Sequence, residues 1–265
     1  MNPKNILVVY ATPTSSEQKK TIALVKRTLK KCKIRHAIVH RDKLNKSSFE
    51  NRDLAIAIGG DGTFLKTAHF IFSNMPVLGV NSDPKFKEGF FMAASRKDFE
   101  KKFSRILDGD YRIRKLSRLE ACIGSKKVPE LALNEFYISR EKEYKTARYY
   151  MAINGKKERQ KSSGVIISTA AGSHAWMKSA GGKILPIDSN KFEYLVREPY
   201  CGRVSAKCAL VNGILDKDDR LEIEFELGRG ILIADSLSRE HKFKAGQKVV
   251  IRNSEKPLYS ILFIE

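Results

Sequence analysis

Continuous apolar runs alternate with amphipathic stretches over the first part of the chain. The apolar runs predict strands buried on both faces of a sheet, at 6–10, 34–39, 54–58 and 76–80. Between them, Ile22, Val25 and Leu29 recur at helical spacing, and 64–72 is also predicted to be helical. Strands that alternate with helices favour parallel βαβ units in an open sheet, which binds ligands at the carboxyl ends of its strands.

The period of the pattern changes near residue 95. Ser95 is a candidate N-cap for an amphipathic helix that we expect to end near Asp108-Gly109. Beyond it the apolar segments are short and strand-like, at 111–123, 131–139, 148–153, 165–168, 208–211, 221–227, 230–233, 248–251 and 259–264. Asn154-Gly155 is the sequence of a type I′ hairpin turn.

The pattern as a whole predicts an α/β plus all-β protein of two domains. The first, 1–95, is an α/β domain that carries a glycine-rich loop. The second, 96–265, is β-rich and sandwich-like. The alternative that its last residues pack back on the first domain stays open.

Composition limits the classes of protein to which the chain can belong. With 42% hydrophobic residues among 265, the chain can bury one sizeable core or two modest ones. It has no apolar stretch of the roughly 20 residues that cross a bilayer, and residues 1–4 lead into a strand without a targeting segment, so we expect a soluble, cytoplasmic protein with no membrane partner. The cysteines have no metal-site spacing and are expected to be reduced; they are Cys32, Cys122, Cys201 and Cys208.

The chain is strongly basic. Its 50 Lys and Arg against 30 Asp and Glu give a net charge of +20, which favours polyanionic partners such as nucleic acid, nucleotides or polyphosphate. A solvated, lysine-rich surface would give the same balance. Because the sequence has no RNP-like aromatic pair, zinc finger or basic-region helix, we expect no nucleic-acid partner.

The strand at 54–58 runs into Gly59-Gly60-Asp61-Gly62-Thr63 and then into a helix. Glycines let backbone N–H groups approach phosphate oxygens, and a helix N-terminus adds favourable potential. The chain contains no G-x-x-x-x-G-K-[ST] loop. Asp61 is the candidate group that accepts the proton of an attacking hydroxyl or helps to hold magnesium. The alternative is a glycine-rich turn in which Asp61 is only an N-cap.

Four motifs in order make the chain resemble the NAD kinase family. They are G-G-D-G-T (59–63), V-L-G-V-N (77–81), Asn134-Glu135, and S-T-A-A-G-S (168–173) with S-A-G-G (179–182). The resemblance extends over about 54–200 and is closest to the mitochondrial-type branch, through 79–84, 161–164, 172–176 and 196–199. It implies an α/β nucleotide-binding domain followed by a β-rich NAD-binding domain. It also implies magnesium-dependent transfer of a phosphoryl group from ATP or polyphosphate to the adenosine-ribose 2′-hydroxyl of NAD, giving NADP.

The resemblance also assigns residues. Asp61 would be the catalytic acid–base group, and Gly59, Gly60, Gly62 and Thr63 would line the phosphates of ATP. Magnesium would be held through the phosphates, with Asp61 as the candidate protein ligand, and no cofactor would be tightly bound. The NAD-binding residues would be Asn81, Asn134, Glu135, Ser163, Thr169, Ser173, His174, Ala175, Trp176, Ser179 and Arg197.

Within that set the family suggests separate roles. Asn134 and Glu135 would hold ribose hydroxyls, Thr169 would meet the adenine amino group, and the Ala175 backbone would contact the nicotinamide end. Ser173 and Ser179 would serve the same pocket. A phosphate partner is expected among Lys161, Lys183, Arg197 and Arg203, with Arg197 first.

The chain departs from many family members at two places. Ser162-Ser163-Gly164 replaces Gly-Asp-Gly, so the carboxylate expected near the nicotinamide is missing, and His174-Ala175-Trp176 replaces Thr-Ala-Tyr. Structural alternatives stay open for several of these positions. Asn134-Glu135 could be a strand-end turn, the serines and threonines helix caps, His174 a loop residue and Trp176 a core or interface anchor.

Two other functions compete with this one. A diacylglycerol- or sphingosine-type lipid kinase shares the G-G-D-G loop, but it needs an apolar slot where 134–182 is polar. The second competing function is that of a catalytically silent NAD(P) sensor. The sequence leaves open whether the donor is ATP or polyphosphate and whether NADH is accepted. The family resemblance implies a homo-oligomer, a homodimer or a tetramer.

Overall fold

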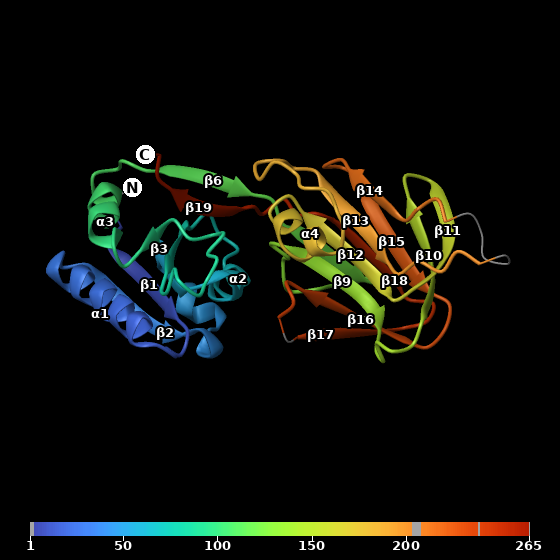
Figure 1. Cartoon of the computed structure of the whole chain (residues 1–265), viewed down its shortest axis with the longest axis horizontal. Coiled ribbons are helices and arrows are strands. Elements are labelled where there is room, and N and C mark those ends of the chain that lie inside the picture. The colour runs from blue at the N-terminus through green and yellow to red at the C-terminus, as the bar shows by residue number, and fades with distance from the viewer. Residues whose placement is uncertain (1–2, 203–207, 238, 265) are drawn as a thin grey trace. The chain divides into compact units, whose positions relative to one another are not determined.

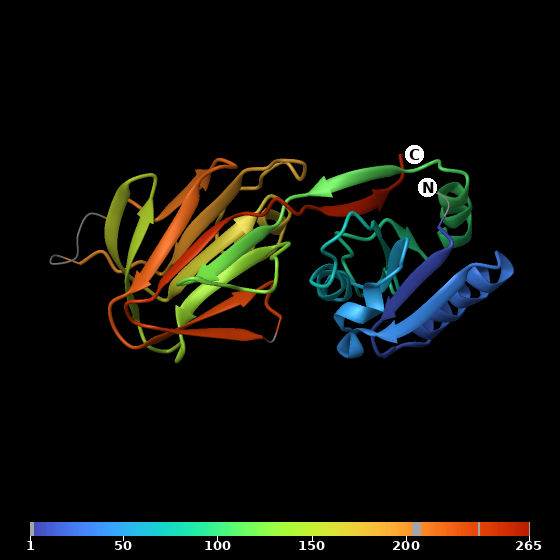
Figure 2. The ribbon, with the colours of Figure 1, turned by 180° about the vertical axis from the view of Figure 1, so that it is seen from behind.

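The computed structural model describes residues 3–202, 208–237 and 239–264 and divides into two compact units (Figures 1 and 2). The first unit comprises Met1–Lys115 and Leu258–Glu265, and the second comprises Leu116–Pro257. The division falls later than the boundary predicted near residue 95. The reason is that Phe99, Phe103 and Ile106 of the next helix pack into the core of the first unit.

A mostly parallel sheet forms the centre of the first unit. Its strand order is β2-β1-β3-β4-β19-β6, with β5 paired to β4. The strands are β1 (Asn5–Tyr10), β2 (Arg35–His40), β3 (Leu54–Gly59), β4 (Val77–Asn81), β5 (Ala94–Ser95), β6 (Arg112–Leu116) and β19 (Leu258–Leu262). The helices are α1 (Ser16–Lys31), α2 (Asp61–Ala68) and α3 (Phe99–Leu107), with short 3-10 turns η1 (Arg41–Lys43) and η2 (Lys46–Phe49). Val25 and Leu29 of α1 join the α3 residues in a core against β1, β3 and β4.

Two antiparallel sheets form the second unit. One has the order β11-β10-β15-β18-β7-β8 and the other β14-β13-β12-β9-β16-β17. Their inner faces share one core, in which Tyr149 and Phe225 of the first sheet pack with Phe136 and Phe192 of the second. The predicted class, an α/β domain followed by a β-rich sandwich, is therefore confirmed.

The elements of the second unit are short, as the sequence indicates. The strands are β7 (Leu119–Ile123), β8 (Lys126–Lys127), β9 (Glu135–Arg140), β10 (Ala147–Ile153), β11 (Lys156–Ser162), β12 (Gly164–Thr169), β13 (Phe192–Arg197), β14 (Asn212–Leu215), β15 (Arg220–Phe225), β16 (Arg229–Ala234), β17 (Glu240–Lys244) and β18 (Lys248–Asn253). The turn η3 (Gly172–His174) and the helix α4 (Trp176–Ser179) follow β12. Asn154 (φ 49°) and Gly155 (φ 79°) form the predicted hairpin turn between β10 and β11.

Some sequence-based elements are wrong. The expected strand at 111–123 is two strands, β6 and β7, which belong to different units. They separate at Arg118, whose buried side chain donates to the carbonyl oxygens of Lys256 and Pro257. The expected strand at 208–211 is not a strand, and β14 begins at Asn212. Ser95 is not the N-cap of α3, because its backbone N–H and hydroxyl donate to Asp98, the residue before the helix.

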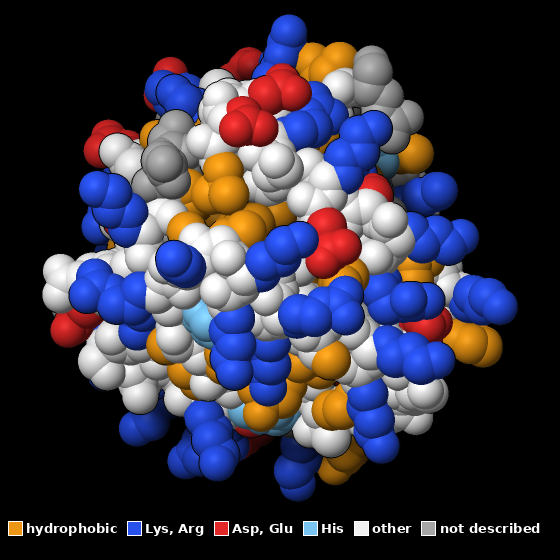
Figure 3. Space-filling model, turned by 90° about the vertical axis from the view of Figure 1, so that its left-hand side faces the viewer, with side chains coloured by type: hydrophobic (Ala, Val, Ile, Leu, Met, Phe, Trp, Pro, Cys, Tyr) orange, Lys and Arg blue, Asp and Glu red, His pale blue; other side chains and the backbone are white. Residues whose placement is uncertain are grey.

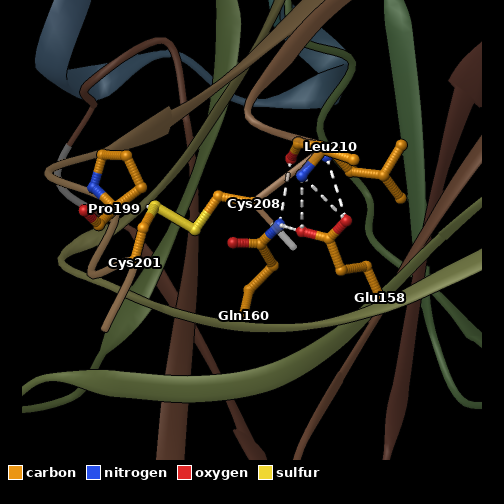
Figure 4. The surroundings of a disulfide bond; sticks show 7 residues. Glu158, Gln160, Pro199, Cys201, Cys208 and Leu210 are labelled. Atoms are coloured by element: carbon orange, nitrogen blue, oxygen red, sulfur yellow. Dashed lines mark hydrogen bonds between the residues drawn. A yellow bond between two sulfur atoms is a disulfide. The ribbon is translucent and has the colours of Figure 1, made fainter. Parts of the chain in front are cut away.

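The expectation that all four cysteines are reduced is also wrong for one pair. Cys201 and Cys208 form a disulfide, with their Cα atoms 5.9 Å apart, while Cys32 and Cys122 are free. Both arms of this loop are fixed to β11, which brings the two cysteines together. On one side the Tyr200 N–H donates to the Lys161 carbonyl oxygen. On the other, Glu158 accepts from the N–H groups of Ala209 and Leu210 (Figure 4).

The surface reflects the basic composition. Lys and Arg side chains are distributed over the whole face seen in Figure 3, with a few acidic groups between them. Among the described residues, no helix has the length and apolar character needed to cross a membrane.

Candidate functional site

The glycine-rich loop lies at the point where the strand order of the first sheet reverses. From β1 the chain moves outward to β2, then returns to the other side of β1 for β3 and β4. Open parallel sheets bind ligands at the carboxyl ends of the strands at such a point. Gly59 must be glycine here, because a Cβ atom would lie 2.3 Å from the Thr63 hydroxyl oxygen. The sheet topology thus places the loop where a ligand site is expected.

Asp61 is the first residue of α2, and its carboxylate is held by the segment that follows β4. Its Oδ1 accepts from the Phe91 N–H at 2.9 Å, and its Oδ2 accepts from the Phe90 N–H at 3.1 Å. The alternative that Asp61 is an N-cap is wrong, since Gly60 is the cap and Asp61 turns away from the helix end. A carboxylate offers about four lone-pair sites, so two backbone donors orient it and leave sites for a ligand.

A cavity of about 240 Å³ adjoins the loop. The carboxyl ends of β1, β2, β3 and β4 supply part of its wall, through Ala11 and Thr12, Arg41, Gly59 and Gly60, and Ser82. Lys87 and the start of α2, at Gly62 and Thr63, complete the wall on the loop side. The cavity therefore joins the predicted phosphate-binding residues to two cations, Arg41 and Lys87, that the sequence did not identify.

Asn81, predicted to bind NAD, is buried beside this cavity. Its Nδ2 donates to the Lys87 carbonyl oxygen at 3.0 Å, and its Oδ1 accepts from the Asp83 N–H at 3.0 Å. Both polar atoms of the Asn81 amide thus bind backbone groups of the segment after β4. In this structure Asn81 shapes the segment that carries Lys87 and orients Asp61.

The other predicted residues gather in the second unit, on the face of the β12 sheet that lies opposite the sandwich core. The register places Glu135, Ser168 and Glu193 side by side across β9, β12 and β13. The next row contains Tyr137 and Ile166, against which Trp176 and Met177 of α4 pack. One end of this face is therefore acidic and the other aromatic.

Asn134 and Glu135 are buried at the acidic end. The N–H groups of 133–135 all donate to the Asp235 carboxylate, which fixes the backbone at the start of β9. Asn134 Oδ1 and Glu135 Oε2 have no hydrogen-bond partner in the part of the chain that the structure describes. Burial, with the nearby Asp235 charge, raises the pKa of Glu135 to about 8. A strand-end turn alone does not explain two buried acceptors that lack donors.

Glu193 is a site residue that the sequence reasoning missed. It is buried, its Oε2 accepts from the Lys183 N–H, and its Oε1 has no partner among the described residues. Burial raises the pKa of Glu193. The signal was available in the alternating pattern of F-E-Y-L-V-R, but only a strand at 192–197 puts Glu193 opposite Ser168.

Thr169 and Ser173 build the turn after β12. The Thr169 hydroxyl donates to the Leu133 carbonyl oxygen and accepts from the Gly172 N–H. The Ser173 hydroxyl donates to the Ala170 carbonyl oxygen and accepts from the Leu185 N–H. Neither hydroxyl is a helix cap, since η3 and α4 have no side-chain cap hydrogen bond. Both hydroxyls instead hold backbone groups of the turn.

The remaining residues of the turn are more accessible. His174 Nε2 lies 3.2 Å from the Leu185 carbonyl oxygen, which places this side chain against the segment 180–185. Ala175 joins η3 to α4, and Ser179 is exposed at the last position of α4. Lys183 is exposed, and Arg203 lies outside the described residues.

Arg197 and two aromatic rings form the other end of the face. The Arg197 guanidinium lies 5.5 Å from the Trp176 ring centre and 5.8 Å from that of Tyr137, and the two rings lie 4.9 Å apart. The Ser163 N–H donates to the Arg197 carbonyl oxygen. The structure thus brings together Ser163, Trp176 and Arg197, which the sequence separates, and offers planar surfaces beside a fixed cation.

The predicted residues therefore form two groups, one in each unit. Two family models match this division: the ATP-NAD kinase N-terminal domain matches residues 4–111, and the ATP-NAD kinase C-terminal domain matches residues 133–263. A protein of Oryza sativa subsp. japonica named "Probable NADH kinase" is 29% identical over 100% of this chain and 86% of its own length.

Two further similarities agree with these matches. An NAD kinase of Francisella tularensis subsp. novicida (strain U112) is 31% identical over 77% of this chain and 69% of its own length. The crystal structure of an NAD kinase from Archaeoglobus fulgidus in complex with ATP superposes with a TM-score of 0.78, covering 98% of this chain and 93% of that one. At 22% identity this last likeness shows the fold.

Proposed function

This chain belongs to the ATP-NAD kinase family, and we propose that it transfers the terminal phosphoryl group of ATP to the adenosine-ribose 2′-hydroxyl of NAD or NADH. In this reaction the 2′-oxygen bonds to the terminal phosphorus, and the bond from that phosphorus to its bridging oxygen breaks. The hydroxyl proton passes to the Asp61 carboxylate. The lipid-kinase alternative has no support from the relatives, which are NAD and NADH kinases.

The observation that carries the proposal is the orientation of Asp61 within the glycine-rich loop. The two backbone hydrogen bonds from Phe90 and Phe91 fix its carboxylate. In a loose transition state the proton moves late, so an ordinary carboxylate suffices if it is well placed. Magnesium, carried by the donor's phosphates with Asp61 as the nearest loop carboxylate, would screen their charge.

The acceptor-rich end of the second unit supports a dinucleotide. Glu135 Oε2, Glu193 Oε1 and Asn134 Oδ1 have no hydrogen-bond partner among the described residues, and the ribose hydroxyls and adenine amino group of a dinucleotide can supply partners. A ligand that satisfies them recovers part of the cost of their burial.

An analogue of NAD that carries 2′-deoxyadenosine tests this function. It keeps the other donors of the dinucleotide, so we expect it to compete with NAD or NADH and to receive no phosphate from ATP. Phosphorylation of this analogue would show that another hydroxyl is the acceptor and would overturn the proposal.

We also propose that the neutral nicotinamide of NADH is accepted at least as well as the cationic one of NAD. The relative from Oryza sativa is named for NADH, and here Ser163 stands where many family members have a carboxylate, next to Arg197. The Arg197 guanidinium, which also pairs with Glu198 at 3.2 Å, opposes a second positive charge by an amount that depends strongly on solvent exposure.

Substitution of Ser163→Asp is expected to raise the ratio of kcat/KM for NAD to that for NADH by about 3- to 10-fold, the size of a partly solvated charge interaction. Ser163→Asn is the matched control, because it adds similar volume without charge. Equal shifts in both variants would contradict an electrostatic cause.

Assembly of the chain as a homodimer or tetramer stays a prediction, which analytical ultracentrifugation checks.

A further inference from the structure

The disulfide of the second unit lies in an accessible connection between two strands. β13 ends at Arg197, and the connection from there to β14 contains Cys201 and Cys208, which the disulfide joins. Cys201 is exposed and Cys208 is half-buried, and an exposed disulfide exchanges with an external thiol more readily than a buried one. The other two cysteines, Cys32 and Cys122, are free thiols. The chain thus carries one accessible disulfide together with unpaired thiols.

The connection is held to β11 on both sides of the disulfide. Before it, the Tyr200 N–H donates to the Lys161 carbonyl oxygen at 2.7 Å, and the Lys161 ammonium lies 4.2 Å from the Tyr200 ring centre. After it, the Glu158 carboxylate accepts from the N–H groups of Ala209 at 3.0 Å and Leu210 at 3.2 Å (Figure 4). The disulfide is the covalent link between these two sets of weaker contacts.

The arm before the disulfide starts at the aromatic end of the β12 sheet face, where Arg197 lies over Trp176. The Arg197 guanidinium is 5.5 Å from the Trp176 ring centre and pairs with Glu198 at 3.2 Å. Glu198 has a φ of 43°, which a residue other than glycine keeps only where the surrounding structure holds it. The Arg197 carbonyl oxygen also accepts from the Ser163 N–H at 3.0 Å. A change in the arm therefore reaches Arg197 through the backbone and through its ion pair.

We propose that the Cys201–Cys208 disulfide is a reversible redox switch. In the oxidised form it holds the arm and thereby Arg197 over Trp176, and in the reduced form the arm is released and the dinucleotide binds more weakly. Ordering a released arm on binding costs conformational entropy that the oxidised form has already lost. The switch rests on the proposed function only for the identity of the ligand at this face.

The reductant is a dithiol, and the reaction is thiol–disulfide exchange. One thiolate of the dithiol attacks the more exposed Cys201 sulfur, the S–S bond breaks, and the Cys208 sulfur leaves as a thiolate. The second thiolate of the dithiol attacks the mixed disulfide at the reductant's own sulfur and releases Cys201. The dithiol becomes a disulfide, its two electrons reduce the protein's bond, and its two protons go to Cys201 and Cys208.

The experiment compares the whole folded chain in the oxidised form and after treatment with dithiothreitol. Alkylation followed by mass spectrometry should label Cys201 and Cys208 only after reduction. Trp176 is the one tryptophan of the chain, so its fluorescence reports on the aromatic end without any ligand. We expect reduction to shift its emission to longer wavelength, because the Arg197 guanidinium no longer covers the ring.

Dinucleotide affinity is measured by titration with NAD and with NADH in the absence of ATP. The Kd should be about fivefold higher in the reduced form, the size of one lost hydrogen bond or cation–π contact. The Kd for magnesium ATP should stay within about twofold, because the glycine loop belongs to the other unit.

Serine variants separate the disulfide from other effects of the reductant. Cys201→Ser should match the reduced parent in Trp176 emission and in dinucleotide Kd, and it should not respond to dithiothreitol. Cys208→Ser breaks the same bond from the other side and should give the same result. Cys122→Ser is the matched control, because it removes a free thiol of the same unit and should keep the full response.

Two results would overturn the switch. One is a disulfide that dithiothreitol does not reduce in the folded protein, and the other is release of both thiols with unchanged Trp176 emission and dinucleotide Kd. A redox-dependent Kd without formation of NADP or NADPH would contradict the proposed function and leave the switch standing. Absence of dinucleotide binding in both forms would contradict both proposals.

Discussion

Substitution of Asp61→Asn is expected to lower kcat for NADP or NADPH formation by about 100-fold or more, the scale of a lost acid–base group. Dinucleotide affinity should change by less than about threefold, because the carboxylate acts on the proton in the transition state. The measurement is kcat and KM with saturating magnesium ATP for the parent and the variant.

A distorted loop would lower kcat in Asp61→Asn just as loss of the base would, so the two causes must be distinguished. The asparagine amide keeps one acceptor for the N–H groups of Phe90 and Phe91, so magnesium ATP should still bind to Asp61→Asn. Asp42→Asn, on the neighbouring turn η1, removes the same charge and should retain kcat within about threefold. Activity of Asp61→Asn within about tenfold of the parent would contradict the assignment of the base.

The second large effect concerns Glu135, where function and stability are expected to oppose each other. Glu135→Gln should weaken dinucleotide binding about tenfold or more, because the glutamine NH2 group can only donate, where a carboxyl oxygen accepts from a ribose hydroxyl. The same substitution should stabilise the free protein at alkaline pH, because glutamine has no charge to bury.

The sign of this stability change follows from the pKa of Glu135, which burial raises from 4.5 to about 8. Between these values the folded state keeps a proton that the unfolded state has lost, so the free energy of unfolding falls as pH rises through the window. Each unit of difference corresponds to about 1.4 kcal/mol. For the parent, the stability gained from protonation is complete below pH 4.5 and lost as pH passes about 8.

Thermal unfolding at about pH 5 and about pH 9 measures this effect. We expect Glu135→Gln to resemble the parent at the lower pH and to have a Tm higher by roughly 5 °C or more at the higher pH. Glu120→Gln is a control of opposite sign, since Lys127 and Arg252 bind Glu120 and its pKa is lowered despite its burial. A Tm difference for Glu135→Gln that does not vary with pH would contradict a raised pKa of Glu135 in the folded protein.

Periodicity was enough to predict the fold class and the position of the glycine loop. Continuous apolar runs gave the buried parallel strands, and Asn154-Gly155 gave a hairpin turn that the positive φ angles confirm. Edge strands were harder. β17, with the sequence E-H-K-F-K, buries only Phe243, so its pattern does not differ from that of a polar loop.

The missed site residues have a common cause. Arg41 lies in a polar stretch without a motif, and only the strand order puts the end of β2 beside the loop after β3. Glu193 and Glu135 lie on either side of Ser168 only through the register of β9, β12 and β13. The Cys201–Cys208 disulfide likewise depends on two arms fixed to β11. Pairing between distant segments, which local patterns do not encode, decides all three.

The most direct test of the central claim is the formation of a 2′-phosphorylated dinucleotide by the purified chain. The protein is incubated with magnesium ATP and either NAD or NADH, and the product is measured with an NADP-specific dehydrogenase beside Asp61→Asn. We expect NADP or NADPH from the parent and at least about 100-fold less product from the variant. Binding of the dinucleotide without product, from ATP and from polyphosphate alike, would contradict it and would identify the protein as a dinucleotide sensor.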